Sequence, residues 1–310
     1  MDIILPFVDC SDKVWMKNYL SFSDSEENSK YLPQIRFGYS QFYNYNTVKY
    51  VIRGIDKYMP YVDNIFFVVS NIEQIPDYID QSKVKIVLHK DFIPENYLPT
   101  FQANTIEMFM YNIPGLGEEF VYFNDDTIPV SYIPYEKLFK DGLPCIDFVE
   151  IYMEPETISY RLSNISFYEG LNTASILKGE QINYNGQALC PVHGPNTFLK
   201  SECLRAVSIK RHQSLLDFYI SPFRIARNIN QYYWLDILYF LNKYVPSTLK
   251  LKYITTQDID TLDVENLSNY NYLCINDFGS ATKTVLELKD VIKNKLEQLF
   301  PNECKYEKHI

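Results

Sequence analysis

The chain has 310 residues, of which 46% are hydrophobic, 16% aromatic and 22% charged, with a formal net charge of −10. This length allows one large domain or two modest ones, and the composition excludes a disordered chain. The negative charge argues against binding to nucleic acid or anionic lipid, because contacts to phosphate backbones depend on clustered Lys and Arg. A nucleotide diphosphate stays compatible with it where a divalent cation or a few Arg side chains neutralise the phosphates.

The sequence predicts neither a membrane-spanning helix nor a signal peptide. No stretch approaches the roughly 20 uninterrupted apolar residues of a membrane-spanning helix. Residues 1–6 (MDIILP) lack the basic and long apolar regions of a signal peptide, and they are expected to form the first buried strand. The six Cys residues show no CxxC pair and no zinc-ligand spacing. A cytoplasmic protein with reduced thiols is therefore expected.

Strand and helix patterns alternate through the first half. Apolar runs predict strands over residues 2–8, 64–70, 84–88 and 119–123. Apolar residues at helical spacing predict helices over residues 46–58 and 105–112. This alternation predicts an α/β fold with a mostly parallel sheet, whose loops gather at the carboxyl edge where ligands bind.

After about residue 142 the pattern changes. Residues 150–190 are polar and are predicted to be irregular. Helical periodicity predicts helices over residues 196–208, 231–244 and 286–300. The simplest expectation is one catalytic domain with a largely helical C-terminal half.

The segment Asn124, Asp125 and Asp126 is the sharpest local signal. Two adjacent carboxylates that follow a buried strand can hold Mg²⁺ or Mn²⁺, and the cation can neutralise a leaving diphosphate. An ordinary turn is the alternative, because Asn and Asp are favoured in turns. Asp9 and Asp12 follow the first strand in the same way, although such residues are more often solvated or cap a helix.

His193 lies in the constrained segment CPVHGP, which has no periodic apolar face. It is the best candidate among the His residues for acid–base chemistry, although an isolated His is more often structural. Arg36, Arg53 and Arg224 are candidate phosphate clamps, because guanidinium groups match phosphate oxygens bidentately. An exposed ion pair is the alternative for each of them.

Glu107 lies on the predicted helix that precedes the acidic segment, and a solvated helix face is its plain interpretation. The motifs GxGxxG, GxxxxGK[ST], GxSxG and HExxH do not occur. Dinucleotide binding of the Rossmann type, P-loop hydrolysis, serine-esterase chemistry and zinc-protease chemistry therefore lose their usual support.

Together these pieces resemble the Stealth family, whose members include bacterial capsular polysaccharide phosphotransferases and the catalytic part of the animal lysosomal-enzyme GlcNAc-1-phosphotransferase. Four blocks of the family occur in order and cover nearly the whole chain. They are FVDCSD at residues 7–12 with Trp15; residues 36–126, with VKYVIRGI, NIFFVV, HKDFIPENYLPTF and VYFNDD; HGP at residues 193–195 with Lys200 and Phe223-Arg224; and CIND at residues 274–277 with the tail over residues 296–307.

The resemblance implies a Rossmann-like, GT-A-like nucleotide-sugar transferase fold and a sugar-1-phosphate transferase. The expected donor is a nucleotide-sugar, the acceptor is a glycan hydroxyl, and the expected cofactor is Mg²⁺ or Mn²⁺. Residues 1–142 would form the α/β half that binds the nucleotide-sugar, and residues 143–310 a mostly helical half that completes the active site. Partners in a capsule-assembly complex could hold the protein at the inner face of the membrane.

Matching positions carry the family's functional residues onto this chain. Residues needed for activity correspond to Glu107, Asp126, His193 and Arg224. Asp125 and Asp126 are the expected metal ligands. Further positions expected to face the substrate are Asp9, Arg36, Arg53, Asn124 and Asp277.

The chain departs from the family pattern at four places, with Phe7 for Trp, Cys10 for Gly, Ala103 for Ser, and Asn228 for an acidic residue. These changes bear on donor or acceptor details rather than on the reaction class. Two alternatives stay open. One is a metal-dependent glycosyltransferase that releases a nucleoside diphosphate, and the other is a non-catalytic carbohydrate-binding protein.

Overall fold

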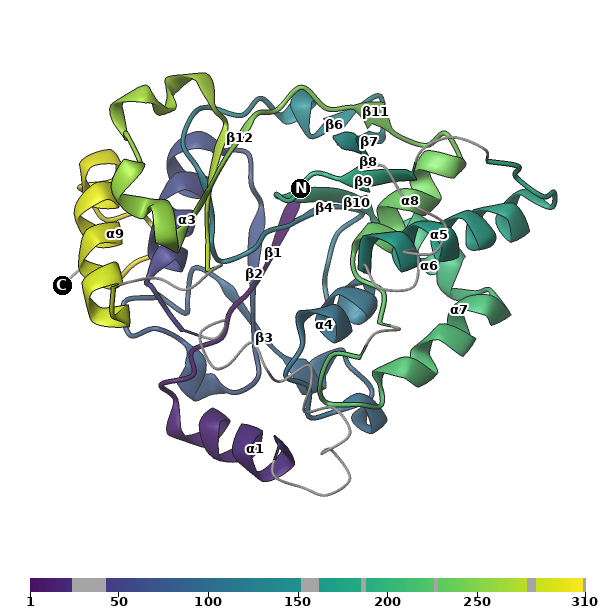
Figure 1. Ribbon diagram of the computed structural model, residues 1–310, viewed down its shortest axis with the longest axis horizontal. Helices are drawn as coiled ribbons and strands as arrows, with labels where there is room; N and C mark the ends of the chain where they lie inside the picture. Colours follow the sequence, from purple (N-terminus) through teal and green to yellow (C-terminus); the bar gives the residue numbers. More distant parts are fainter. Residues whose placement is uncertain (24–42, 152–161, 185–187, 226–227, 278–282, 309–310) are drawn as a thin grey trace.

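The computed structural model describes residues 1–23, 43–151, 162–184, 188–225, 228–277 and 283–308 (Figure 1). Within these residues the strands are β1 Asp2–Pro6, β2 Asn64–Val69, β3 Lys85–Leu88, β4 Glu119–Tyr122, β5 Thr127–Pro129, β6 Phe139–Lys140, β7 Leu143–Ile146, β8 Phe148–Ile151, β9 Ala188–Pro191, β10 Asn196–Leu199, β11 Val245–Pro246, β12 Leu251–Thr255 and β13 Tyr272–Asn276. The α-helices are α1 Lys13–Ser23, α3 Thr47–Tyr58, α4 Ala103–Phe109, α5 Leu162–Lys178, α6 Lys200–Val207, α7 Lys210–Leu216, α8 Tyr232–Phe240 and α9 Val285–Leu299.

The central sheet has the strand order β10-β4-β1-β2-β3. β1 pairs in parallel with β2 and with β4, and β2 pairs in parallel with β3, whereas β10 is antiparallel to β4. The predicted α/β fold with a mostly parallel sheet is confirmed. The loops that follow β1 and β4 leave the sheet at the same edge, because parallel strands end on the same side.

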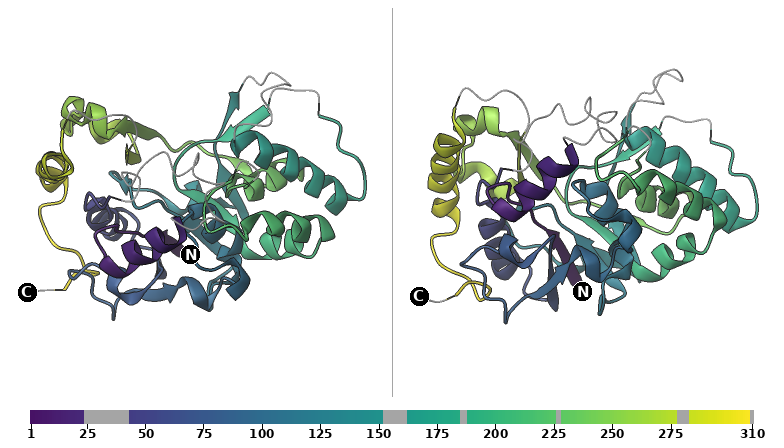
Figure 2. Two further views of the ribbon diagram at one scale, coloured as in Figure 1. Left: turned by 60° about the horizontal axis from the view of Figure 1, so that its bottom comes forward. Right: turned by 90° about the horizontal axis from the view of Figure 1, so that it is seen from below.

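Side chains of the central strands alternate between two apolar clusters. Ile3 and Phe67 pack with residues of α3 and α9 on one face, while Ile4 and Phe66 pack with residues of α4 and α8 on the other. Figures 1 and 2 show the same division, with the yellow helix α9 on one side of the sheet and the teal to green helices α5 to α8 on the other. Both faces are covered, which explains why these strands read as continuous apolar runs in the sequence.

A smaller sheet, with the order β12-β13-β5, adjoins the carboxyl edge of the central one. β5 begins directly after the acidic segment, and α3 packs closely against it at Gly54. A Cβ at this position would lie 2.5 Å from the backbone oxygen of Pro129, so any side chain would push β5 away. The glycine costs α3 about 1 kcal/mol of helix propensity, and it sets where the acidic segment sits.

Most predicted elements are confirmed within a few residues, but two predictions were wrong. Residues 196–199 form β10 instead of the first turn of a helix, because they pair with β4 and Phe198 stacks on Phe120 at 5.4 Å between ring centroids. Part of the polar segment predicted to be irregular forms helix α5. Phe167 and Ala174 of α5 are fully buried, and the helix packs against α8, so a tertiary contact stabilises it.

The longest elements after residue 142 are helices, although short strands also occur there. Strands from both sides of this position share sheets, since β10 joins β4 and β5 joins β13. That residues 1–142 bind the nucleotide-sugar and that residues 143–310 complete the active site stays a prediction. Within the described residues, no helix combines the length and the apolar character needed to cross a membrane.

Candidate active site

The acidic segment forms the turn between β4 and β5, at the carboxyl edge of the central sheet. The backbone N–H of Thr127 donates to the carbonyl oxygen of Asn124 at 3.2 Å and closes the turn. Asp125 and Asp126 are half-buried there. Removal from water, and secondly the neighbouring charge of Asp126, raise the pKa of Asp125 to about 7. The turn interpretation is correct as geometry, and the two carboxylates are close enough for the charge of one to shift the pKa of the other.

The direction of β10 places His193 at the same edge. β10 runs antiparallel to β4 and its first residue, Asn196, lies opposite Tyr122, so the residues just before it meet the segment that follows β4. The ring of His193 packs edge-on against Tyr253, 5.8 Å between centroids. Its Nε2 is buried and has no hydrogen-bond partner among the described residues. A buried polar atom without a partner is costly, and in a functional site it is available to a ligand.

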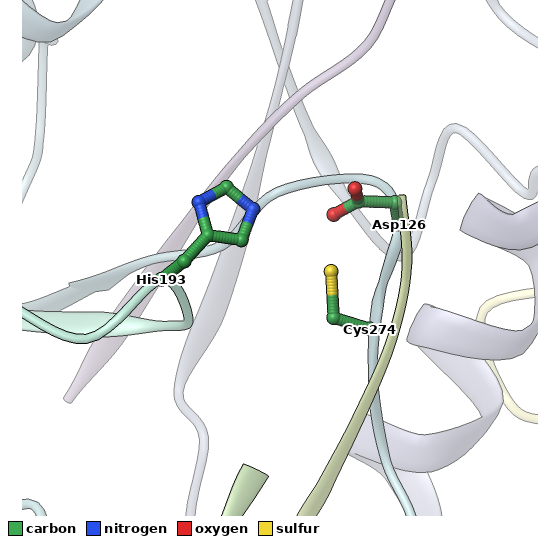
Figure 3. A group of neighbouring side chains, drawn as sticks. All are labelled: Asp126, His193 and Cys274. Atoms are coloured by element: carbon green, nitrogen blue, oxygen red, sulfur yellow. The ribbon is translucent and has the colours of Figure 1, made fainter. Parts of the chain in front are cut away.

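A third side chain, Cys274, lies beside Asp126 and His193. It was not identified from the sequence. The Sγ of Cys274, a carboxylate oxygen of Asp126 and a ring nitrogen of His193 all lie within 4.8 Å of one another (Figure 3). Cys274 lies opposite Thr127 in the antiparallel pair of β13 and β5. The spacing of the cysteines in the chain contains no signal for this, because strand pairing brings the residues together.

Asp277 follows β13 and lies near the same edge. Burial raises its pKa, while the hydrogen bond from Thr256 opposes the shift. The Thr256 hydroxyl donates to Oδ1 at 3.2 Å, and Oδ2 is buried with no hydrogen-bond partner among the described residues. Its predicted contact with the substrate stays a prediction that this geometry permits.

Asp9 follows β1 and belongs to a polar network. Asn44 donates to its carboxylate at 2.9 Å, and its backbone N–H donates to Oε1 of Gln74 at 2.7 Å. Gln74 in turn donates to Asp12 at 2.8 Å. Asp12 accepts the backbone N–H of Val14 at 2.9 Å at the start of α1, so the helix-cap interpretation holds for Asp12.

Glu107 lies on α4, on the face of the central sheet that α4 and α8 cover. Arg224 lies near enough for its charge to act on Glu107. Glu107 is buried in α4, and its carboxylate accepts two hydrogen bonds from Gln231, from the backbone at 2.9 Å and from the side chain at 3.2 Å. Burial raises its pKa, while Gln231 and the positive charge of Arg224 oppose the shift. Arg224 itself is exposed. The solvated-helix interpretation of Glu107 was therefore wrong, and its anchor Gln231 was not identified from the sequence.

The structure corrects the prediction for Arg53. Its guanidinium is buried and pairs bidentately with Glu307, at 2.6 Å from Nε to Oε1 and at 2.8 Å from Nη2 to Oε2. Nη1 also donates to the carbonyl oxygen of Phe300 at 2.7 Å. The donor groups that would clamp phosphate are thus used to tie the end of the chain to α3. Arg36 lies outside the described residues.

The structure shows where the four residues that depart from the family pattern lie. Asn228 is fully buried, and it accepts the backbone N–H of Ile225 at 2.7 Å and donates to the carbonyl oxygen of Phe218 at 2.8 Å. Ala103 is exposed at the start of α4, whereas Cys10 and Phe7 are buried beside the first strand. None of these residues belongs to the group around Asp126.

These residues fit a divalent cation. Asp125 and Asp126 are adjacent, half-buried carboxylates, and among the described residues no Lys or Arg forms an ion pair with either. A pair of this kind is stabilised when a cation binds between the oxygens. The unpartnered Nε2 of His193 faces the same space.

Comparison with known proteins shows which family and which enzymes the chain is similar to. Residues 41–145 match the family described as Stealth protein CR2, conserved region 2. Capsular polysaccharide phosphotransferase WcwK of Streptococcus pneumoniae is 25% identical and receptor polysaccharide phosphotransferase WefC of Streptococcus oralis 27% identical, each over 99% of both chains. Over this region the chain is therefore similar to the Stealth family, and over its whole length it is similar to polysaccharide phosphotransferases.

The chain is a transferase of phosphorus-containing groups, as predicted. The exopolysaccharide phosphotransferase cps2G of Lactiplantibacillus plantarum is 36% identical over 46% of this chain and 41% of its own. Among solved structures, galactosyltransferase LgtC in complex with donor and acceptor sugar analogs covers 95% of this chain and 96% of its own, at 11% identity and a TM-score of 0.40. That likeness is distant, and the sheet topology carries the fold class.

Proposed function

We propose that this protein transfers a hexose-1-phosphate, such as GlcNAc-1-phosphate, from a nucleotide-sugar to a sugar hydroxyl of a capsular or cell-surface polysaccharide. A phosphodiester forms and a nucleoside monophosphate leaves. The observation that carries the proposal is the meeting of Asp126 and His193 at the carboxyl edge of the sheet, with their ligand atoms within 4.8 Å. The names of the full-length relatives, which are polysaccharide phosphotransferases, support the same reaction class.

The proposed roles follow from charge and burial. Asp125 and Asp126 would hold Mg²⁺ or Mn²⁺, which supplies positive charge to the diphosphate and to the leaving nucleotide. His193, whose Nε2 is unpartnered among the described residues, accepts the proton of the acceptor hydroxyl. Arg224 is exposed beside Glu107 and contacts the donor phosphate, while Glu107 positions that arginine.

Three further residues belong to the proposed substrate site. Asp9, Asn124 and Asp277 follow β1, β4 and β13 at or beside the carboxyl edge, and they face the donor. The acceptor oxygen attacks the phosphorus that carries the anomeric oxygen, and the P–O–P bond breaks in line with this attack. Reactions of this type depend mainly on positioning and on charge neutralisation, which a rigid sheet edge provides.

The test is to incubate the protein with a panel of nucleotide-sugars, Mg²⁺ or Mn²⁺ and a short glycan acceptor, and to identify the nucleotide and the glycan product. A nucleoside monophosphate, released in step with a glycan that gains sugar plus phosphate, is expected. Release of a nucleoside diphosphate with a glycan that gains sugar alone would replace this proposal by the glycosyltransferase alternative. Asp290→Asn, a change of an exposed carboxylate on α9, is the control for Asp126→Asn in the same assay.

A further inference from the structure

The group Asp126, His193 and Cys274 contains three different kinds of metal donor: a carboxylate oxygen, an imidazole nitrogen and a thiol sulfur. Its ligand atoms lie within 4.8 Å of one another. The residues come from the turn before β5, the loop before β10 and strand β13. The backbone N–H of Ile275 donates to the carbonyl oxygen of Asp126 at 3.0 Å, which ties two of these segments together. The backbone therefore holds the donors in place before any ion arrives.

The donor set favours a different ion from the one that the reaction needs. Mg²⁺ and Mn²⁺ prefer oxygen ligands, as Asp125 and Asp126 provide, whereas Zn²⁺ accepts nitrogen and sulfur together with oxygen. Zn²⁺ takes three protein ligands at about 2.0–2.3 Å and keeps a fourth position open in many sites, so bound donors lie about 3.5 Å apart. Donors within 4.8 Å of one another would have to move closer by about 1 Å to reach that spacing.

The individual side chains are poised for such binding. Nε2 of His193 is buried and lacks a hydrogen-bond partner among the described residues. Asp126 is oriented by Thr127, whose hydroxyl donates to Oδ1 at 3.0 Å, and by Asn276, whose amide lies 3.4 Å from Oδ2. Partners of this kind hold a ligating carboxylate in position. Asp126 and His193 are half-buried while Cys274 is fully buried, so an ion reaches the sulfur from the side of the other two.

Other thiols of the chain do not share this arrangement. Among the described residues, Asp126, His193 and Cys274 make up the one group of three His, Cys, Asp or Glu donors within reach of a common ion. Cys190 is half-buried three residues before His193 without belonging to the group. It provides a matched control for Cys274.

We propose that Asp126, His193 and Cys274 bind Zn²⁺, and that this ion inhibits the enzyme by occupying the carboxylate and the imidazole that the transfer reaction uses. Binding releases the thiol proton of Cys274 to solvent and involves no oxidation or reduction. The inhibition rests on the proposed function, whereas the zinc site itself does not. A soft donor beside the catalytic carboxylate thus makes this transferase sensitive to the balance between Zn²⁺ and Mg²⁺.

Binding is tested without any substrate by titrating the full chain with Co²⁺, a spectroscopic substitute for Zn²⁺. The wild-type protein is expected to show the near-ultraviolet absorption of a cobalt–thiolate bond, and one equivalent of Zn²⁺ is expected to abolish it. Cys274→Ser removes this absorption and Cys190→Ser keeps it. Absence of the thiolate band in the wild-type protein, or its persistence in Cys274→Ser, overturns the zinc site.

A second variant covers the case in which Cys274→Ser does not fold. His193→Ala changes a half-buried side chain, and its affinity for Zn²⁺, measured by competition with a chromophoric chelator, is expected to fall at least tenfold. Unchanged affinity in this variant overturns the site as well.

Inhibition is then measured as the ratio of phosphotransfer rates with and without micromolar Zn²⁺ at fixed Mg²⁺, within each variant. The zinc concentration for half inhibition is expected to rise at least tenfold in Cys274→Ser and to stay at the wild-type value in Cys190→Ser. Equal sensitivity of Cys274→Ser and wild type overturns the regulatory role. If no nucleotide-sugar supports phosphotransfer while the thiolate band is present, the proposed function fails and the zinc site stands.

Discussion

Two clusters of charged side chains differ in how completely their polar atoms are partnered. Arg53 and Glu307 form a buried bidentate pair, and the carboxylate also accepts the backbone N–H of Cys304 at 3.1 Å. At the carboxyl edge of the sheet, Asp125 and Asp126 stand side by side without a Lys or Arg ion pair among the described residues. The carboxylate of the first cluster has its counter-charge within the fold, whereas those of the second have none among the described residues.

For this reason the carboxyl pKa is lowered at Glu307 and raised at Asp125. Burial acts to raise the pKa of Glu307, but the hydrogen bonds and charge of Arg53 outweigh it, and the pKa is lowered. Burial and the charge of Asp126 raise the pKa of Asp125 to about 7. A partnered buried charge stabilises the fold, whereas carboxylates crowded without a counter-charge mark a place kept for function at some cost in stability.

The largest effect is expected on activity at the second cluster. Asp126→Asn and His193→Ala each lower the transfer rate by about 10²–10⁴-fold, the range for loss of an acid–base or charge-stabilising group. Thermal unfolding stays within a few degrees of the wild type, because neither side chain supports the core. The measurement is initial rate at saturating donor together with a melting curve. Near-wild-type turnover of His193→Ala would show that this residue is not the base.

The first cluster is expected to behave in the opposite way. Glu307→Gln leaves Arg53 buried without its counter-charge and costs about 3–5 kcal/mol of unfolding free energy. The transfer rate per folded molecule is retained at temperatures where the variant is folded. Urea unfolding monitored by circular dichroism measures the loss, and a change below about 1 kcal/mol would contradict the structural role assigned to the pair.

Asp236 is another carboxyl group without a counter-charge, and it lies away from the sheet edge. It is fully buried on α8, and neither of its carboxylate oxygens has a hydrogen-bond partner among the described residues. Burial raises its pKa well above the ordinary value. As pH rises past that ordinary value, the unfolded chain releases this proton before the folded chain does, so this residue makes the folded state progressively less stable.

Asp236→Asn cannot titrate and keeps the Cβ that packs against Gly170. We expect it to be more stable than the wild type at pH 8 by about 1–3 kcal/mol, and to gain less at pH 5. Urea titrations at both pH values measure the difference, with Asp290→Asn as the exposed control. A gain that is the same at both values would mean that the carboxyl group does not control the pH dependence.

The smallest effect is expected at an exposed ion pair. Lys293 and Glu297 lie one turn apart on α9, 3.9 Å between charged atoms, and both side chains reach solvent. Lys293→Ala is expected to change the unfolding free energy by less than about 0.5 kcal/mol. The same urea titration checks this. A loss of unfolding free energy close to that of Glu307→Gln would show that burial does not explain why the two ion pairs differ in strength.

Local patterns predicted much of the fold. The apolar run of β2 and the periodic apolar face of α3 were sufficient, because both signals repeat within a few residues of the chain. The same rules failed for β10, whose four residues were taken into the helix that follows them although Thr197 and Phe198 favour a strand. They also failed for α5, whose buried face is set by contact with α8. In both cases pairing or packing with a distant segment decided the element.

The candidate site divides in the same way. The turn at Asn124 to Asp126 was visible from the sequence, since a buried strand followed by acidic residues is a local pattern. His193 and Arg224 were candidates from their residue chemistry, whereas Glu107 became one only through the family resemblance, and the roles of all three stay predictions. Arg53 was mistaken for a phosphate clamp because its partner Glu307 lies 254 residues away in the chain.

The sequence by itself determined the α/β class, the order of the main elements, the acidic turn and the resemblance to the Stealth family. Only the tertiary structure decided which polar groups meet and which stay without a partner. Strand pairing brought Cys274 to Asp126, and the packing of the chain end against α3 gave Arg53 its counter-charge. The physical reason is range: periodicity reports on neighbours along the chain, whereas burial and hydrogen bonding depend on contacts between distant segments.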